Sequence, residues 1–307
     1  MATAAYKLES NFSPTREYTS VPAAAAAAGT ATVPNVTCAS FGSEEQLLAA
    51  LSRDSLTNVV MAGFIRDHGL MNPLNRGNFY FCRDEKNRVE GVALLGHTIL
   101  FEAFSDRAIQ AFAALARRES SPHLLMGEHN AVQRFWTYYS SNADSPRLVC
   151  PIVFLQRRES FEEQTEVTGL RPATYEDLEQ VVQSQAAMAL EISGVDPLTK
   201  DPAGFRERYR RRIAKQRVWV VIEDGRLIFK TDVIADTPQA AYIEGVYVGR
   251  EERGKGVGRR CVSALGRILL KRSNAIYLFV ENQNTRTKSF YLNLGFTVAG
   301  QYELLYF

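Results

Sequence analysis

Hydrophobic and polar residues in the C-terminal half follow the patterns of both helices and strands. Two short apolar runs flank Asp224-Gly225, which is a strong signal for a β-hairpin. Residues 276–280 are apolar without interruption, as expected of a strand buried on both faces. The predicted elements are a short strand at 170–174, a helix opened by Thr174 and Asp177 that runs to 193, a basic helix at 204–215, a hairpin at 218–222 and 227–229, a strand at 242–248, a helix through 261–269, a strand at 276–280, a helix at 285–293, and two short strands that end at Phe307.

The N-terminal half repeats part of this order. It predicts a hairpin at 79–81 and 89–95, a strand at 98–103, a helix capped by Ser105, a strand at 123–126, a helix at 130–139 and a strand at 148–155. The helix after Ser105 places Ile109, Phe112, Ala113 and Ala116 on one face. We interpret the two halves as two copies of one fold, and two unrelated α/β domains are the alternative.

Changes in composition mark the expected domain boundaries. Residues 1–35 contain an alanine run at 23–28 and predict a flexible tail, because they bury too little apolar area to offset the entropy of ordering. An isolated polyalanine helix is the alternative. We expect one domain at 36–157, a polar, Glu-rich linker at 158–168 and a second domain at 169–307.

Composition and charge exclude several classes of protein. The 307 residues include 36 Lys and Arg against 34 Asp and Glu, and 46% are hydrophobic. These values are typical of globular proteins and argue against a disordered chain or a collagen-like fibre. The net charge of +2 gives no reason to expect nucleic acid or a membrane surface as a partner. No apolar run is long enough to span a bilayer and no secretory signal is recognisable, so we expect a cytoplasmic protein.

The four cysteines fit a reducing compartment. They are scattered, form no CxxC pair and have no histidine cluster nearby. Neither a disulfide framework nor a zinc site is therefore expected, and no metal is predicted. The four are Cys38, Cys82, Cys150 and Cys261.

A glycine-rich turn is the most informative segment of the chain. The strand at 242–248 ends, residues 253–258 read Arg-Gly-Lys-Gly-Val-Gly, and a helix begins. Closely spaced glycines let backbone N–H groups converge on an anion, and a helix N-terminus adds partial positive charge. Arg253, Lys255, Arg259 and Arg260 add full charges. The turn therefore predicts a pyrophosphate site, although neither the GxGxxG spacing nor a P-loop is present and an ordinary basic surface turn is the alternative.

These residues resemble a known family. Residues 253–258 match the (Gln/Arg)-x-x-Gly-x-(Gly/Ala) signature of the GCN5-related N-acetyltransferases (GNAT), and residues 291–296 match the family's Tyr-x-x-x-Gly-Phe. Asn284 stands seven residues before Tyr291, as is usual in that family. The resemblance covers about 170–307, and the whole chain resembles a bacterial subgroup with a preceding GNAT-like domain. The expected fold is therefore an α/β mixed sheet in two tandem GNAT-like domains, of which the N-terminal one is degenerate.

The resemblance implies acetyl-CoA as donor and direct transfer of the acetyl group to an amine in a ternary complex. Tyr291 would protonate the departing thiolate. The residues that the resemblance places at the CoA are Val246, Tyr247, Val248, Arg253, Gly254, Lys255, Gly256, Val257, Gly258, Arg259, Asn284, Thr287 and Tyr291. The acceptor is not predicted beyond an amine on a protein lysine, a protein N-terminus or a small molecule, and a longer acyl donor is an alternative.

Glu244 is the candidate general base. It stands in an apolar strand, where a carboxylate is costly unless it is paired or used, and we expect it on one face with Tyr242 and Val246. A salt bridge to Lys230 or to an arginine of 208–212 is the alternative role. A chain of water molecules is the alternative base.

Two hypotheses of different class follow. The first is an N-acetyltransferase, which the intact Tyr291 and the open glycine turn favour. The second is a non-catalytic, CoA-responsive binding or regulatory module on the same fold. The N-terminal domain is expected to bind no CoA, because its corresponding turn has no glycine and carries Glu102 and Asp106 where phosphate would lie.

Overall fold

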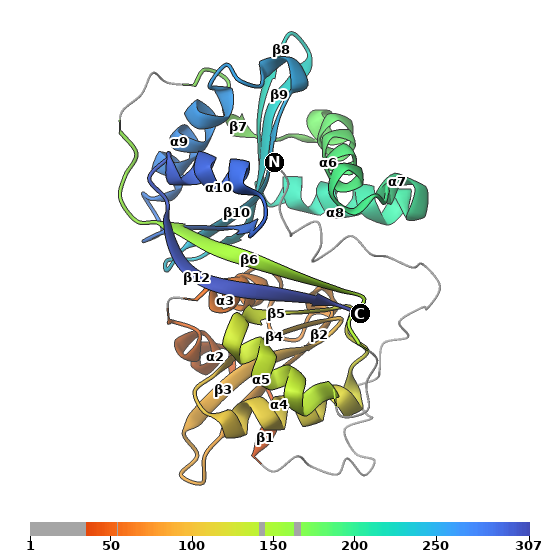
Figure 1. Cartoon of the computed structure of the whole chain (residues 1–307), viewed down its shortest axis with the longest axis vertical. Coiled ribbons are helices and arrows are strands. Elements are labelled where there is room, and N and C mark those ends of the chain that lie inside the picture. The colour runs from red at the N-terminus through yellow and green to blue at the C-terminus, as the bar shows by residue number, and fades with distance from the viewer. Residues whose placement is uncertain (1–34, 54, 141–144, 163–166) are drawn as a thin grey trace. The chain divides into compact units, whose positions relative to one another are not determined.

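The computed structural model describes residues 35–53, 55–140, 145–162 and 167–307 (Figure 1). The predicted flexible tail therefore lies outside the described residues, except for Asn35. Contacts divide the described chain into two compact units. Unit 1 comprises residues 153–299, and unit 2 comprises the residues up to 152 together with 300–307.

Unit 2 is a mixed sheet with helices on both faces. Its strands follow the order β1-β2-β3-β4-β5 and then the end of β12, with β4 and β5 parallel and the other described pairs antiparallel. Its elements are β1 (Val36–Cys38), α2 (Glu44–Ala50), α3 (Leu56–His68), η2 (Pro73–Asn75), β2 (Gly77–Arg83), β3 (Val89–Gly96), β4 (Thr98–Ala103), α4 (Asp106–Glu119), β5 (Leu124–Glu128), α5 (His129–Tyr139) and the start of β6 (Leu148–Arg157).

Helix α4 follows the sequence pattern closely. Ser105 accepts a hydrogen bond from the Ala108 N–H, as a helix cap does, and the four predicted face positions are all buried. Helices α2 and α3 were not predicted. Most of α3 is buried, so its apolar residues are not confined to one face and give no helical period to recognise.

Unit 1 has the same kind of architecture. Its strands follow the order β6-β11-β10-β9-β8-β7, and the pair β10–β11 is parallel. Its elements are the end of β6, β7 (Arg171–Pro172), η4 (Tyr175–Asp177), α6 (Leu178–Ser193), α7 (Pro197–Lys200), α8 (Pro202–Ala214), β8 (Val218–Glu223), β9 (Arg226–Asp236), β10 (Ala241–Val248), η5 (Arg250–Glu252), α9 (Val257–Leu269), β11 (Ile276–Glu281), α10 (Thr285–Leu292) and the start of β12 (Thr297–Tyr306).

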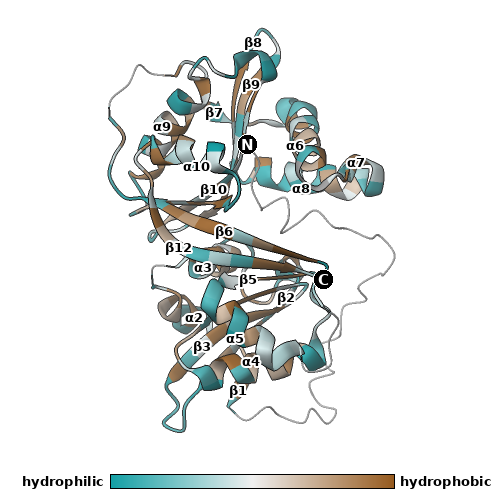
Figure 2. Ribbon diagram, in the orientation of Figure 1, coloured by the Kyte–Doolittle hydropathy of each residue, from teal (hydrophilic) through white to brown (hydrophobic). Residues whose placement is uncertain are grey.

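Two apolar clusters fill unit 1, one on each face of its sheet. Alternate residues of β8 belong to different clusters, as the period of two requires. Val218 and Val220 pack with α6 and α8, whereas Trp219 and Val221 belong to the cluster that contains α9 and Tyr291. Hydrophobic residues follow the strands, and the helices carry hydrophilic positions among them (Figure 2). The predicted mixed α/β fold is therefore confirmed.

Strands β6 and β12 each contribute to both units. Residues 153–157 of β6 belong to unit 1, and residues 300–307, which include most of β12, belong to unit 2. β12 is one strand rather than the two short ones predicted, because its second part pairs with β5 from Tyr302 to Tyr306. The units thus differ from the expected domains 36–157 and 169–307. Phe161, in the predicted polar linker, is buried in the core of unit 1.

Membrane-spanning helices and metal sites are the two features of the described residues that bear on partners. Among them, no helix combines the length and the hydrophobicity needed to cross a bilayer. The described part of the chain also contains no group of three or more His, Cys, Asp or Glu side chains arranged to hold a metal ion.

Candidate functional site

The glycine turn leads directly into helix α9. Gly254 and Gly256 have φ angles of 83° and 77°, in the left-handed region that favours glycine. Gly256 is the N-cap of α9 and supplies no side chain to cap it. The N–H groups of the first helical turn, at 257–259, therefore point out of the helix with no intrahelical partner. Together with the helix dipole, they form a site suited to an anion.

Gly258 has a different function in this turn. A Cβ atom there would lie 3.1 Å from Cγ2 of Val248, closer than most Cβ contacts. The third glycine therefore allows helix α9 to pack tightly against the end of β10.

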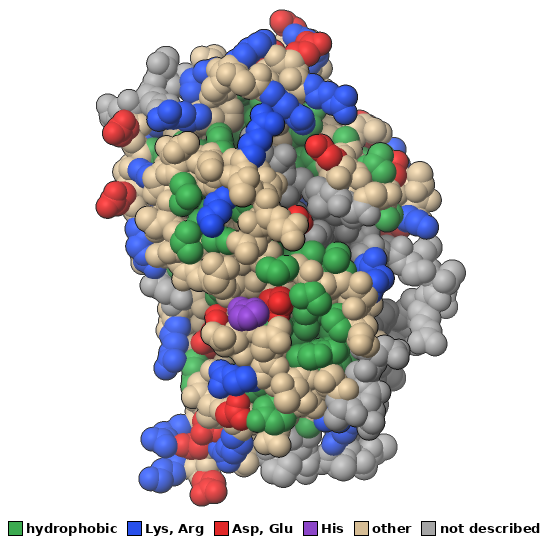
Figure 3. Space-filling model, in the orientation of Figure 1, with side chains coloured by type: hydrophobic (Ala, Val, Ile, Leu, Met, Phe, Trp, Pro, Cys, Tyr) green, Lys and Arg blue, Asp and Glu red, His purple; other side chains and the backbone are tan. Residues whose placement is uncertain are grey.

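Two of the basic side chains brace the turn. Nε of Arg253 donates to the Val248 carbonyl at 3.2 Å, and Nη1 of Arg260 donates to the Lys255 carbonyl at 3.0 Å. Lys255 itself pairs with Glu252 at 3.2 Å, and Arg259 is exposed. On the face shown in Figure 3, basic side chains lie near the tip of the β8–β9 hairpin of unit 1, with acidic side chains among them.

Strand β10 diverges from β11 before it reaches the turn. The two parallel strands pair only at Ala241 and Tyr242. The register of β10 against β9 then shifts between Glu244 and Tyr247, and Gly245 has a φ of 61°. This is a β-bulge in the pairing with β9, and beyond Tyr242 no further residue of β10 pairs with β11. Ligands of α/β sheets bind where the carboxyl ends of parallel strands separate.

The bulge changes which side chains share a face. Val246 packs with Ile243 and Val248 in the cluster that contains α9. Glu244 stands opposite Asp232 in the register with β9, so these two face the α6–α8 side. The expectation that Glu244 and Val246 lie on one face is therefore wrong, because the extra residue at Gly245 reverses the alternation.

Glu244 belongs to a buried polar cluster. Glu244 is 1% exposed and Lys230 is fully buried. Nζ of Lys230 donates to Asp232 Oδ2 at 2.6 Å and to Gln185 Oε1 at 2.5 Å, and Arg212 also contacts Asp232, at 3.2 Å. Burial lowers the pKa of Lys230, while the nearby carboxylates of Asp232 and Glu244 oppose that shift. Sequence reasoning named Lys230 as a possible partner of Glu244 but missed Asp232 and Gln185.

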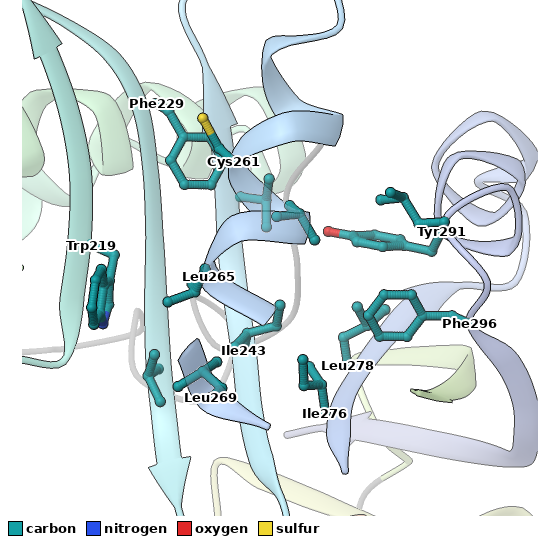
Figure 4. Packing of buried hydrophobic residues seen from close by; sticks show 14 of the residues in the cluster. Trp219, Phe229, Ile243, Cys261, Leu265, Leu269, Ile276, Leu278, Tyr291 and Phe296 are labelled. Carbon is teal, nitrogen blue, oxygen red and sulfur yellow. The ribbon is translucent and has the colours of Figure 1, made fainter. Parts of the chain in front are cut away.

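Tyr291 lies in the core beside α9. It is 3% exposed, and its ring contacts Phe290 and Phe296 edge to face at 5.0 and 5.5 Å between centroids. Figure 4 shows its hydroxyl pointing away from α10 toward helix α9, which carries Cys261 and Leu265. Among the described residues the hydroxyl has no hydrogen-bond partner. Burial raises the pKa of Tyr291 above its usual value, so the phenol remains protonated at neutral pH.

The Tyr-x-x-x-Gly-Phe motif forms the C-terminal cap of α10. The Phe296 N–H donates to the Tyr291 carbonyl at 3.1 Å, and the Gly295 N–H donates to the Leu292 carbonyl at 2.9 Å. Gly295 is left-handed, with φ 78°. This is a Schellman motif, and the Tyr291–Phe296 ring contact supplies the hydrophobic pair that accompanies it. The spacing of the motif therefore fixes the tyrosine and the turn together.

Asn284 is the N-cap of α10. Its Oδ1 accepts a hydrogen bond from the Thr287 N–H at 3.0 Å, and Thr287 is 8% exposed. Asn284 thus sets where α10 begins, after the end of β11. The glycine turn, β10, Asn284 and Tyr291 all belong to unit 1.

The corresponding turn in unit 2 is built differently. Helix α4 follows β4 as α9 follows β10, but its N-terminus is capped by Ser105. Burial raises the pKa of Glu102, whose Oε2 accepts a hydrogen bond from Ser55 at 3.1 Å. The turn therefore has neither the left-handed glycines nor the open helix end of unit 1.

Comparison with known proteins agrees with the fold and the motifs. The model of the acetyltransferase (GNAT) family matches residues 187–296. No curated protein matches the chain.

Solved structures match most of the chain at low identity. A GNAT-family acetyltransferase from Colwellia psychrerythraea is 13% identical, with 89% of this chain and 99% of that chain covered and a TM-score of 0.55. A Drosophila protein is 11% identical over 89% and 98%, with a TM-score of 0.65. A tandem GNAT protein from the clavulanic acid biosynthesis pathway is 13% identical over 88% and 98%, with a TM-score of 0.52. Residues 187–296 therefore belong to the GNAT superfamily, and the chain as a whole has the fold of a tandem GNAT protein.

Proposed function

We propose that this chain is an acetyl-CoA-dependent N-acetyltransferase that acts through unit 1. The observation that carries the proposal is the uncapped N-terminus of α9, preceded by two left-handed glycines. Its N–H groups suit a pyrophosphate, and no side chain of the cap competes for them. When bound, acetyl-CoA supplies the activated acetyl group and a thiolate leaving group.

The residues of unit 1 fit the arm of such a donor. Amides at 254–259 would hold the pyrophosphate, with Arg253, Lys255 and Arg259 adding charge. Strand β10, at Val246, Tyr247 and Val248, would offer backbone groups where it has left β11. Asn284 and Thr287, at the start of α10, would contact the arm from the other side.

Tyr291 is the proposed general acid. A thiolate leaves more easily when a proton is available within hydrogen-bond reach. The Tyr291 hydroxyl keeps its proton because burial raises its pKa, and no described side chain holds it in another hydrogen bond. The proton therefore remains available for the sulfur.

Glu244 is the proposed general base. An amine attacks only when it is neutral, so a group that accepts its proton assists the reaction. Glu244 lies between Tyr242, the last residue of β10 that pairs with β11, and the bulge at Gly245. This position is close to where the donor arm would enter. Glu244 interacts electrostatically with the neighbouring Lys230 in the buried cluster.

Thiol release from acetyl-CoA tests the proposal, with a panel of small amines, polyamines, lysine peptides and peptides with free N-termini. We expect release that depends on at least one amine class. Calorimetric titration with CoA on the same preparation gives the binding stoichiometry. Saturable CoA binding without turnover on any amine would instead support the non-catalytic, CoA-responsive module.

The titration also carries a prediction of its own. We expect one CoA per chain, because unit 2 has a Ser105 cap where unit 1 has an open helix end. The single site should weaken on substitution in the 253–258 turn and should not respond to Ser105→Ala. Two sites of similar affinity would contradict this reading of unit 2.

A further inference from the structure

One carbonyl at the end of α10 is held by a residue from outside the family motifs. The Schellman motif uses the carbonyls of Tyr291 and Leu292. The Leu294 carbonyl instead accepts a hydrogen bond from Nη1 of Arg157, at 2.8 Å. Arg157 ends strand β6 and lies outside residues 187–296, which match the family model.

Arg157 is itself fixed by two further contacts. Its Nη2 donates to the Ser160 carbonyl at 2.7 Å, and its guanidinium lies over the Phe161 ring, 4.2 Å from the centroid. A guanidinium that donates to two carbonyls and stacks on a ring has little freedom to move. A cation at a helix C-terminus is also favoured by the helix dipole.

The turn that carries Gly295 fits closely around Arg157. A Cβ atom on Gly295 would lie 1.7 Å from Nη1 of Arg157, so the guanidinium would have to shift. The glycine of the motif therefore supplies the left-handed φ and also leaves room for the guanidinium in its present position.

The segment 157–161 is also linked to Tyr291 through aromatic side chains. Phe161 lies 6.2 Å from Phe296 between ring centroids, and Phe296 contacts the Tyr291 ring at 5.5 Å. The Tyr291 carbonyl also accepts from the Leu294 N–H at 3.0 Å. Arg157 thus holds the backbone of the turn after Tyr291, and Phe161 lies beside the Phe296 ring that contacts Tyr291.

We propose that Arg157 is a positioning residue for Tyr291: by holding the Leu294 carbonyl, it fixes the C-terminal turn of α10 and with it the direction of the Tyr291 hydroxyl. The inference rests on the proposed function, in which Tyr291 is the general acid. A general acid displaced by about 1 Å loses about 100-fold in rate. The charge-assisted bond to Leu294 is strong enough to control such a displacement.

The test is a double-mutant cycle in the full chain. Arg157→Met removes the donors and keeps much of the side-chain length, and we expect kcat to fall by about 10- to 100-fold with the CoA dissociation constant changed by less than about 2-fold. Arg157→Lys keeps a charged donor and should recover part of the loss. Arg158→Met, an exposed neighbour with the same change of charge, is the matched control and should retain the wild-type kcat.

The second half of the double-mutant cycle shows whether Arg157 affects kcat through Tyr291. In a Tyr291→Phe background, Arg157→Met should lower kcat no further, since the hydroxyl that it positions is absent. An equal further loss in that background, or an unchanged kcat in Arg157→Met alone, would overturn the proposal.

Hydrogen exchange provides a readout that does not need turnover. In Arg157→Met we expect the amides of Leu294, Gly295 and Phe296 to exchange about 10- to 100-fold faster, with helix α9 unchanged. If the wild type transfers no acetyl group, the proposed function fails, and exchange still decides whether Arg157 holds the turn. Unchanged exchange at these amides would overturn the proposal by itself.

Discussion

Tyr291→Phe should lower kcat by about 10- to 10⁴-fold and leave CoA affinity nearly unchanged. The substitution removes one hydroxyl whose proton is needed only as charge develops on the departing sulfur. The ring contacts with Phe290 and Phe296 remain. Steady-state kinetics with the amine that supports turnover, together with calorimetric titration of CoA, measure the two effects separately.

Loss of stability would not explain such a result. Among the described residues the Tyr291 hydroxyl has no hydrogen-bond partner, so its removal leaves no group newly unsatisfied. We expect the free energy of unfolding to change by about 1 kcal/mol or less. Tyr80→Phe is a matched control, because it removes another buried hydroxyl, one that donates to Glu119 in unit 2. An unchanged kcat in Tyr291→Phe would exclude the general-acid role.

The pH profile of the same variant gives a further check. Burial raises the pKa of Tyr291 above the ~10 of a free tyrosine, so the phenol stays protonated through neutral and mildly alkaline pH. Any alkaline limb of kcat below about pH 10 must therefore come from another group. That limb should keep its midpoint in Tyr291→Phe, at a lower absolute rate.

Gly256→Val should weaken CoA binding by at least about 10-fold while the fold is retained. A β-branched residue is strained at a φ of 77°, and a Cβ atom there would lie 3.3 Å from Nη1 of Arg260, which braces the turn. The side chain would also stand at the helix end where the N–H groups of α9 are open. Calorimetric titration with CoA measures the loss.

A second glycine separates backbone strain from obstruction of the site. Gly225 is also left-handed, with φ 72°, and a Cβ atom there meets nothing within 4 Å. Gly225→Val should therefore cost stability similar to Gly256→Val but leave CoA affinity close to wild type. Wild-type affinity in Gly256→Val would show that the pyrophosphate lies elsewhere.

Local sequence signals predicted the backbone conformation of the glycine turn and of the turn after Tyr291. The glycines at 254 and 256 are left-handed and α9 begins after them, as their spacing indicates. The Tyr291 motif is equally local, because its Schellman cap needs only residues 291–296. The alternating and continuous apolar runs likewise identified most strands.

The features that the sequence did not predict depend on contacts between segments far apart along the chain. The bulge at Gly245 depends on pairing with β9, which no single strand reveals, and it reversed the face of Val246. Arg157 stands at the end of the first expected domain, next to the predicted linker, and its partner Leu294 is 137 residues away. Lys230 and Asp232, at alternate positions of β9 between two apolar runs, were the available signal for the buried cluster around Glu244.

The shared strands β6 and β12 have a consequence for how the chain is made. Unit 2 takes residues 300–307 into its sheet, so it lacks a strand until those residues have left the ribosome. N-terminal domains usually fold first during synthesis, but unit 2 cannot complete its sheet before residues 300–307 have been made. The β5–β12 pairing closes a loop that contains the whole of unit 1, and such long loops make folding slow. Until β12 arrives, the edge of β5 remains open to pairing with another chain.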